Sequence, residues 1–355
     1  MEFLAIDVNE GDCFVLKDDN YSIIIDGGKQ KKGIVSKLKK NNIKYITQLG
    51  CTHYDSDHIN GIIGICESSS FRINEIILPA VWVDLIYTLQ INNENRDFFK
   101  NIYKYYTDNN LNSDNNGLPN YESLNVESDI NTYEMIDLNI LESICFSSDN
   151  FYFHYLGNRF IDFLPYISIN ILKKIARIIL ASIKSGAHIR WIKYQDKLTN
   201  HKISKLTELI ALNGNEVQPC SLKPDIFILS LLCLSKINQE SLVFKYHSYD
   251  KPNVLFSGDS NFSFLNGKAL NLKDYSIVTA PHHGSQSNTF IYSLLKEKNI
   301  IFVRSDRFQN SRPCLDYIAL QHKYCTTCKG DVAKNTVKLN YNEIWNTKNN
   351  RCICQ

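Results

Sequence analysis

The stretch LGCTHYDSDHINGIIG, residues Leu49 to Gly64, decides the fold of this chain. It brings His53, Asp55, Asp57 and His58 within six residues, after a β-like run and before an apolar, helix-like run. Alternate side chains of an extended segment share one face, and the fourth joins them where the helix turns away. Two imidazoles and two carboxylates facing one spot are costly unless a cation lies between them. Donors of this mix indicate a zinc, manganese or iron site; the alternative is a solvated loop rich in His and Asp.

The composition is that of a globular protein without a membrane span. Of the 355 residues 44% are hydrophobic, and a net charge of +2 argues against a strongly basic nucleic-acid coat, while leaving room for a local basic groove. The most apolar long segment, Ile161 to Ile183, contains Lys173, Lys174 and Arg177, which indicates an amphipathic or buried helix. The chain enters a strand-like run without a basic leader, and 11 cysteines without an export signal indicate reduced thiols or metal ligands. We therefore expect a cytoplasmic protein.

The pattern of elements divides the chain into a split core, an insert and a tail. Strand signals fill residues 1–83 and return over 225–313, and strand meanders with helices between them predict an α+β sandwich of two sheets covered by helices. Residues 84–224 contain an Asn/Asp-rich piece and a strongly helical segment from Phe160 to Leu198, so we expect a mostly helical insert or cap. Residues 314–355 form a C-terminal tail.

Further strand ends carry polar residues that are candidate partners of the His/Asp stretch. One strand-like run ends in Gly-Asp at Asp259, and the next ends in APHHGS with His282 and His283. An Asp at a strand end is often an ordinary turn residue, whereas a His pair beside Gly is harder to explain in this way. Turn chemistry, with a supporting role behind metal ligands left open, is expected for three N-terminal carboxylates: Asp7, Asp12 and Asp26.

Six segments in this order resemble the metallo-β-lactamase superfamily: IDVNEGDCFVL, IIIDGG, THYDSDHINGI, SLVFKY, VLFSGD and APHHGS. They are similar in particular to the hydrolase domain of the DNA-uptake protein ComEC and its soluble relatives. That family carries a D-V-G-Q-G-D opening, an H-x-[HD]-x-D-H turn, and strand ends in G-D and H-H-G-S. The resemblance covers roughly residues 1–80 and 225–310. It implies a four-layer αββα fold with two divalent metal ions, zinc or manganese, at one edge of the sandwich.

The resemblance also implies a role for each matching residue. The predicted ligands are His53 and Asp55 for the first ion, Asp57, His58 and His282 for the second, and Asp259 as the bridge. His283 is expected to face the substrate and Asp57 to orient the nucleophile as well as bind metal. Which of the two neighbouring histidines binds metal is open.

Two departures from the family pattern concern the first ion. Asp55 stands where many members have a histidine. A carboxylate is a harder ligand than an imidazole, which favours manganese or weaker metal binding at the first site. A histidine for the usual ligand between the His/Asp stretch and Asp259 is not evident. His247 lies in a predicted hairpin turn, and the family's relatives have an Asn/Ser-containing segment here, seen as Asn238 to Ser241.

The implied activity is metal-dependent hydrolysis. Two dications about 3.5–4 Å apart lower the pKa of a bridging water, hold it as hydroxide and neutralise charge on phosphoryl oxygens. Arg304, Arg307 and Arg312 follow the His pair and suit phosphate contacts, with a solvated loop as the alternative. We expect a phosphodiester hydrolase, foremost a DNA nuclease, with a partner protein from a multi-gene system. The alternatives are a small-molecule hydrolase of cyclic nucleotides, phosphoesters or acyl compounds, and a non-catalytic binding module with a degenerate site.

The C-terminal tail carries a second candidate metal site. Cys325 and Cys328 form a C-x-x-C pair, and Cys352 and Cys354 form a C-x-C pair. Four thiolates in two short pairs match a closed structural zinc site, and free thiols are the alternative because C-x-C is the less common spacing. Such a knuckle would fasten the tail or contact nucleic acid.

Overall fold

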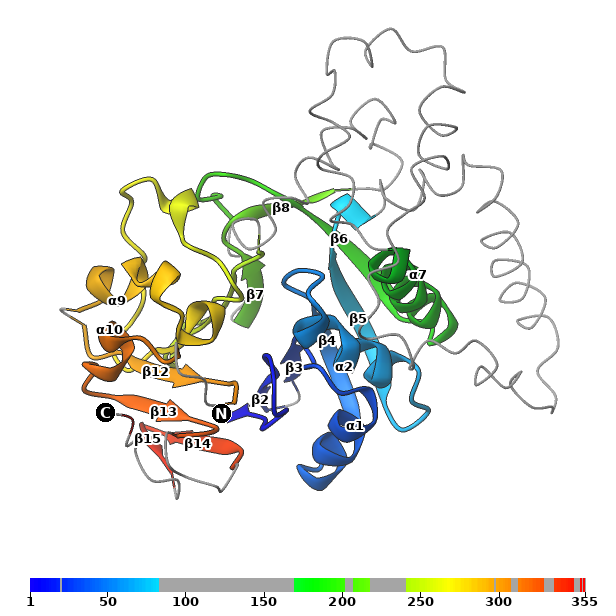
Figure 1. Ribbon diagram of the computed structural model, residues 1–355, viewed down its shortest axis with the longest axis horizontal. Coiled ribbons are helices and arrows are strands. Elements are labelled where there is room, and N and C mark those ends of the chain that lie inside the picture. Colours follow the sequence, from blue (N-terminus) through cyan, green and yellow to red (C-terminus); the bar gives the residue numbers. More distant parts are fainter. Residues whose placement is uncertain are drawn as a thin grey trace, which may run out of the picture.

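The computed structural model describes residues 1–19, 21–82, 169–201, 207–217, 241–296, 298–307, 312–328 and 335–347, together with Cys352 and Cys354. These residues form two sheets with helices on both outer sides (Figure 1). The predicted strand from Asp225 to Leu234 and residues 84–168 of the predicted insert lie outside the described residues. Within the described part of the chain, none of the helices combines the length and the apolar character needed to cross a bilayer.

The larger sheet has the strand order β15-β14-β1-β2-β3-β4-β5-β6-β8. Its strands are β1 (Glu2–Ala5), β2 (Phe14–Asp18), β3 (Tyr21–Ile25), β4 (Tyr45–Gly50), β5 (Arg72–Pro79), β6 (His188–Tyr194), β8 (Gly214–Val217), β14 (Val337–Asn342) and β15 (Ile344–Asn346). The central strands β3 to β6 run parallel to one another, and the strands at both sides pair antiparallel.

The smaller sheet has the strand order β13-β12-β11-β10-β9-β7. Its strands are β7 (Thr207–Ala211), β9 (Phe244–Ser248), β10 (Val254–Phe256), β11 (Ile277–Thr279), β12 (Ile301–Arg304) and β13 (Lys323–Cys325). Strands β10 to β13 are parallel, whereas β9 is antiparallel to both of its neighbours.

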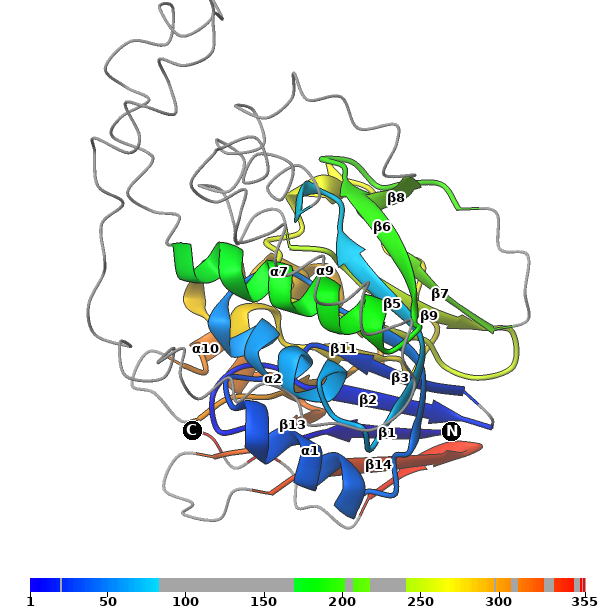
Figure 2. The same ribbon diagram turned by 90° about the vertical axis from the view of Figure 1, so that its right-hand side faces the viewer.

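Helices cover the outer face of each sheet. On the larger sheet lie α1 (Lys31–Lys40), α2 (Ser56–Cys66) and α7 (Ile169–Lys184), side by side (Figure 2). On the smaller sheet the elements are shorter: η6 (Ser263–Leu265), α9 (Phe290–Leu294) and α10 (Leu315–Ile318). Two further single turns, η7 (Pro281–Gly284) and η8 (Gln286–Asn288), follow β11.

Alternation of side chains along the strands produces three hydrophobic cores: one between the two sheets and one between each sheet and its outer helices. In β1, Leu4 packs in the core under α1, α2 and α7, whereas its neighbour Phe3 packs between the sheets. In β10, Val254 faces the space between the sheets and Leu255 faces the outer helices. Successive strand side chains point to opposite faces, so two sheets with apolar residues on both faces need four layers. The predicted αββα sandwich is confirmed.

The last part of the predicted insert and the C-terminal tail both contribute strands to the sandwich. The amphipathic segment forms α7, but the prediction of helix as far as Leu198 is wrong. The chain instead forms β6, because pairing with β5 on one side and β8 on the other stabilises an extended backbone. In the tail, β13 joins the smaller sheet and β14 pairs with β1 of the larger one. A helical cap stays a prediction for residues 84–168.

Candidate metal centre

Polar residues gather where parallel strands of the two sheets end. Asp26 follows β3, His53 follows β4, Asp259 follows β10, and His282 and His283 follow β11. Side chains beyond the carboxyl ends of parallel strands are free of the ladder and can converge on one crevice, which is where ligands bind in open α/β sheets.

Close packing of glycines positions α2 against the turn after β3. Gly61 N donates to Gly28 O and Gly27 N donates to His58 O, both over 2.8 Å. A Cβ atom on Gly61 would lie 1.8 Å from Gly27 O, so only glycine permits this approach. The approach places His58 directly beside Asp26.

Asp26 is buried and orients two imidazoles. His58 Nδ1 donates to Asp26 Oδ2 over 2.8 Å. The Thr52 hydroxyl also donates to this oxygen, over 2.7 Å, and its own oxygen accepts from His53 Nδ1 over 2.9 Å. Because both rings use Nδ1 as the donor, each Nε2 presents its lone pair to the opposite side, as in metal-binding histidines.

Asp259 lies between these Nε2 atoms, and its two oxygens face different histidines. Oδ1 lies 3.4 Å from His58 Nε2 and 3.9 Å from His283 Nε2. Oδ2 lies 3.8 Å from His53 Nε2 and 3.6 Å from His282 Nε2. This is the arrangement that a carboxylate bridging two cations requires.

Two groups of donor atoms share Asp259, and the atoms of each group lie within 4.8 Å of one another. The groups are His53, Asp55 and Asp259, and Asp12, His58, Asp259 and His283. Within these two groups, four buried polar atoms have no hydrogen-bond partner among the described residues: Asp12 Oδ2, His53 Nε2, His58 Nε2 and Asp259 Oδ1. Two ligand atoms about 2.1 Å from one tetrahedral ion lie about 3.4 Å apart, close to the spacings observed. The residues therefore fit two divalent cations.

The charged groups set one another's protonation. Burial alone would lower the pKa of His58 and His283, but the surrounding carboxylates outweigh it and raise both pKa values well above the usual range. Burial likewise opposes ionisation of Asp259, yet the histidines hold its pKa well below the usual range. In the absence of a cation, protons on the imidazoles compensate the carboxylates.

The two histidines after β11 occupy different positions around Asp259. His282 and His283 both adopt left-handed backbone angles, with φ of 46° and 55°. This turn directs His283 inward, leaving its side chain 1% exposed against 20% for His282. His283 Nδ1 donates to Asp12 Oδ1 over 3.1 Å, and the ring joins the group of His58. The structure thus places His283 in that group, whereas His282 was the residue expected there; His282 lies on the other side of Asp259.

Asp12 joins the second donor group, and Asp57 lies beside it. Gly11, at φ 88°, brings the N-terminal turn so close to α2 that a Cβ there would lie 1.7 Å from Asp57 O. Asp12 is buried, whereas the Asp57 side chain is 33% exposed with Oδ2 3.3 Å from His283 Nε2. The Gly-Asp pair of the opening segment is the sequence signal that could have identified Asp12 as a candidate ligand.

The segment before β9 supplies a supporting residue. Ser241 Oγ accepts from Asp259 N over 3.0 Å and lies 3.4 Å from His53 Nδ1, so it supports both residues from behind. His247, on β9, packs against Tyr249 instead. The second imidazole beside Asp259 Oδ2, next to that of His53, belongs to His282.

The three predicted phosphate-binding arginines have different environments. Arg304 is completely buried and donates to three backbone carbonyls, among them His283 O over 2.7 Å, so its prediction as a phosphate ligand is wrong. Arg307 is exposed and pairs with Glu10 over 2.8 Å. Arg312 reaches the candidate metal centre, where its Nη2 lies 3.3 Å from His282 Nε2 and donates to it.

Comparisons by sequence and by structure gave different results. No family model matches the sequence, and no curated protein matches it. Among solved structures, a diphosphatase from the PhnP family is similar at 10% identity, covering 96% of this chain and 98% of that one, with a TM-score of 0.41. The dizinc quorum-quenching lactonase AidC, in complex with its product, is 11% identical over 70% of this chain and 57% of its own, with a TM-score of 0.27. A long-form RNase Z from yeast is 10% identical over 91% and 40%, with a TM-score of 0.32. Such values transfer no activity, so the function is argued from the site itself.

Proposed function

We propose that this protein is a metal-dependent hydrolase of phosphodiester bonds, with DNA as its substrate. The position of Asp259 supports this most: its two oxygens face two groups of imidazoles and carboxylates, and the Nε2 atoms of His53 and His58 lack a hydrogen-bond partner among the described residues. When bound there, two divalent ions supply an activated water and neutralise negative charge on phosphoryl oxygens.

The chain's own residues orient the imidazoles and the attacking water. Asp26 and Asp12 fix the histidine rings from behind, which reduces the reorganisation needed during the reaction. Asp57 is the more accessible carboxylate. Burial opposes its ionisation, but His283 and His58 outweigh burial and hold the pKa of Asp57 well below the usual range. It is therefore ionised at neutral pH, and its oxygens can accept a hydrogen bond that orients the attacking water.

Cations at the rim suit an anionic substrate. Arg312 lies beside His282, and Lys174 of α7 donates to Ser56 Oγ over 2.9 Å, between the two aspartates of the His/Asp stretch. Burial, and then the neighbouring Lys31 and Lys29, lower the pKa of Lys174. Phosphate groups bound near these side chains would offset the repulsion between their positive charges.

The substrate class is tested with one panel. The full chain, loaded with Mn²⁺ or Zn²⁺, is assayed on single- and double-stranded DNA, on a cyclic nucleotide and on an acyl ester. DNA cleavage that falls at least about 10²-fold in Asp57→Ala and disappears in His58→Ala supports the proposal. Asp250→Ala is the matched control, since this carboxylate pairs with Ser248 on a hairpin. Cleavage of the cyclic nucleotide or ester alone would establish the small-molecule hydrolase, and metal binding without turnover would establish the binding module.

A further inference from the structure

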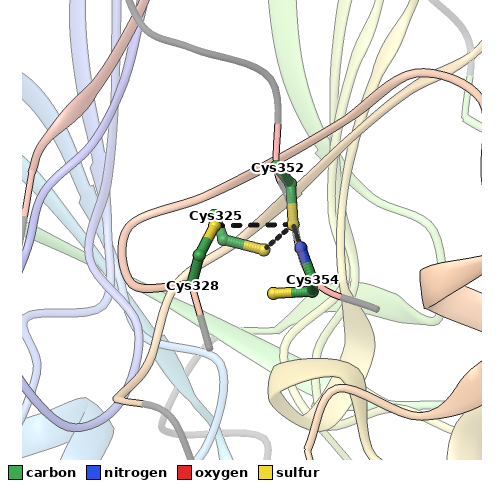
Figure 3. Close-up of side chains that lie close together, drawn as sticks. All are labelled: Cys325, Cys328, Cys352 and Cys354. Atoms are coloured by element: carbon green, nitrogen blue, oxygen red, sulfur yellow. Dashed lines mark hydrogen bonds between the residues drawn. The ribbon is translucent and has the colours of Figure 1, made fainter. Parts of the chain in front are cut away.

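The four cysteines of the C-terminal tail lie together at the edge of the smaller sheet (Figure 3). Their sulfur atoms lie within 4.8 Å of one another. Cys352 Sγ lies 3.0 Å from Cys325 Sγ and 3.6 Å from Cys328 Sγ, both longer than the disulfide bond length of about 2.05 Å. Thiolates about 2.3 Å from one tetrahedral Zn²⁺ lie about 3.8 Å apart. The cluster has this size without any ion.

Backbone contacts around the cluster are of the kind that stabilise bound thiolates. Cys354 N lies 3.5 Å from Cys352 Sγ and donates to it, which favours the charged form of the sulfur. Cys352 N donates to Lys323 O over 3.1 Å, so the second cysteine pair is also hydrogen-bonded to β13. Strand β13 is the edge of its sheet. Cys352 therefore bonds to a strand edge that has no neighbouring strand among the described residues.

We propose that Cys325, Cys328, Cys352 and Cys354 bind one Zn²⁺ as four thiolates, separately from the His/Asp centre. The ion links the first cysteine pair to the second and so fastens the C-terminal end of the chain to β13. It is a structural ion, because four protein ligands leave no open position for substrate or water.

The same ion stiffens the turn that supports His283. Between the first two cysteines, Thr327 O accepts from Arg304 Nη1 over 3.2 Å, and Thr326 N donates to Arg304 O over 3.0 Å. The buried Arg304 in turn donates from Nε to His283 O over 2.7 Å. A chain of direct bonds therefore runs from the cysteine turn to the backbone of a donor of the metal centre. The link to His283 rests on the proposed function, whereas the zinc site itself does not.

The test uses cobalt as a spectroscopic probe on the full chain. Co²⁺ held by thiolates absorbs in the near ultraviolet through sulfur-to-metal charge transfer, and carboxylate and imidazole ligands do not produce this band. We expect wild type and His58→Ala to show the band, and Cys328→Ser and Cys354→Ser to lose it. Zinc content should fall by one ion per chain in the cysteine variants, while the His/Asp centre keeps its metal. The control Cys66→Ser replaces a buried thiol of α2 and should leave the band intact.

Two outcomes would overturn the site. One is Co²⁺ binding to the wild-type chain with no charge-transfer band, which needs no variant to fold. The other is a disulfide between Cys325 and Cys352, found by mass spectrometry of the denatured, alkylated chain. Failure of DNA cleavage would leave this result untouched, so the two proposals are tested separately. For the link to His283, metal at the His/Asp centre should exchange faster in Cys328→Ser than in Cys66→Ser; equal rates would exclude the link.

Discussion

Asp26 is buried, and it determines where the Nε2 atoms of two histidines point. It holds His58 directly and His53 through Thr52. We expect Asp26→Asn to weaken metal binding at the His/Asp centre by roughly 10- to 100-fold, because a neutral amide holds the rings less firmly and lowers their basicity. Competition with a chelating dye measures the affinity.

The control for this prediction is Asp7→Asn. Asp7 lies in the same N-terminal part of the chain, but its carboxylate accepts a hydrogen bond from Asn9 N over 3.1 Å and so stabilises the first turn. Affinity should be unchanged there. Equal loss in both variants would mean that Asp26 acts only on general stability.

The raised pKa values of His58 and His283 predict how metal binding depends on pH. Both rings hold protons in the metal-free protein at neutral pH, and those protons must leave when metal binds. Metal affinity should therefore rise from pH 6 to pH 8. The metal-free fold should show the opposite trend: its stability from these protonated rings is complete below the unfolded value of about 6.5 and is lost as pH rises through the raised pKa values.

Affinity by dye competition and thermal unfolding of the chelator-treated chain test these two trends. The two should move in opposite directions with pH. A metal affinity that is flat over this range, with no protons released into the buffer during calorimetry, would contradict the assignment of these histidines as inward-facing donors.

At the scale of elements, the contact between α2 and the turn after β3 is the most sensitive. Gly61→Ala should destabilise the protein by roughly 3 kcal/mol, because the added Cβ meets the Gly27 backbone, which cannot move without shifting His58. Gly33→Ala is the matched control in α1, where the added Cβ meets the flexible Gln30 side chain at 3.1 Å. That variant should be neutral or up to about 1 kcal/mol more stable.

Urea unfolding followed by circular dichroism compares the two glycine variants. A Gly61→Ala protein as stable as Gly33→Ala would show that the helix can shift away from the turn. Metal affinity measured on the same samples then tells whether that shift also displaces His58.

For the whole molecule, the C-terminal strands are part of the core that the N-terminal residues build. β14 pairs with β1, and Leu339 lies opposite Phe3 in the space between the sheets. Leu339→Ala should cost about 2–5 kcal/mol, as for any large residue removed from a packed core. Its neighbour Asn340 is exposed, and Asn340→Ala should change stability by less than about 0.5 kcal/mol.

Thermal or urea unfolding checks the Leu339 pair. Similar stabilities for the two variants would mean that β14 packs loosely on the sandwich and contributes little to its core.

The sequence by itself predicted the αββα sandwich and most of the residues that the structure brings together around Asp259. Apolar alternation in short strands requires two sheets with both faces covered, and His53, Asp55 and His58 lie on a strand-to-helix stretch whose geometry is local. The cysteine pairs were equally visible in the sequence, because two short pairs are recognised by their spacing alone.

Only the tertiary structure decided which side chains face the centre from distant turns. His282 and His283 are neighbours, and their orientations depend on two consecutive left-handed residues that no hydrophobic pattern reveals. Asp12 reaches the centre because Gly11 lets the first turn pack on α2, and Arg304 is structural because three carbonyls converge on it after folding. Strand β6 was likewise decided by its neighbours in the sheet. Local patterns specify elements, whereas the direction of a side chain beyond a strand end depends on contacts that form only when distant turns pack together.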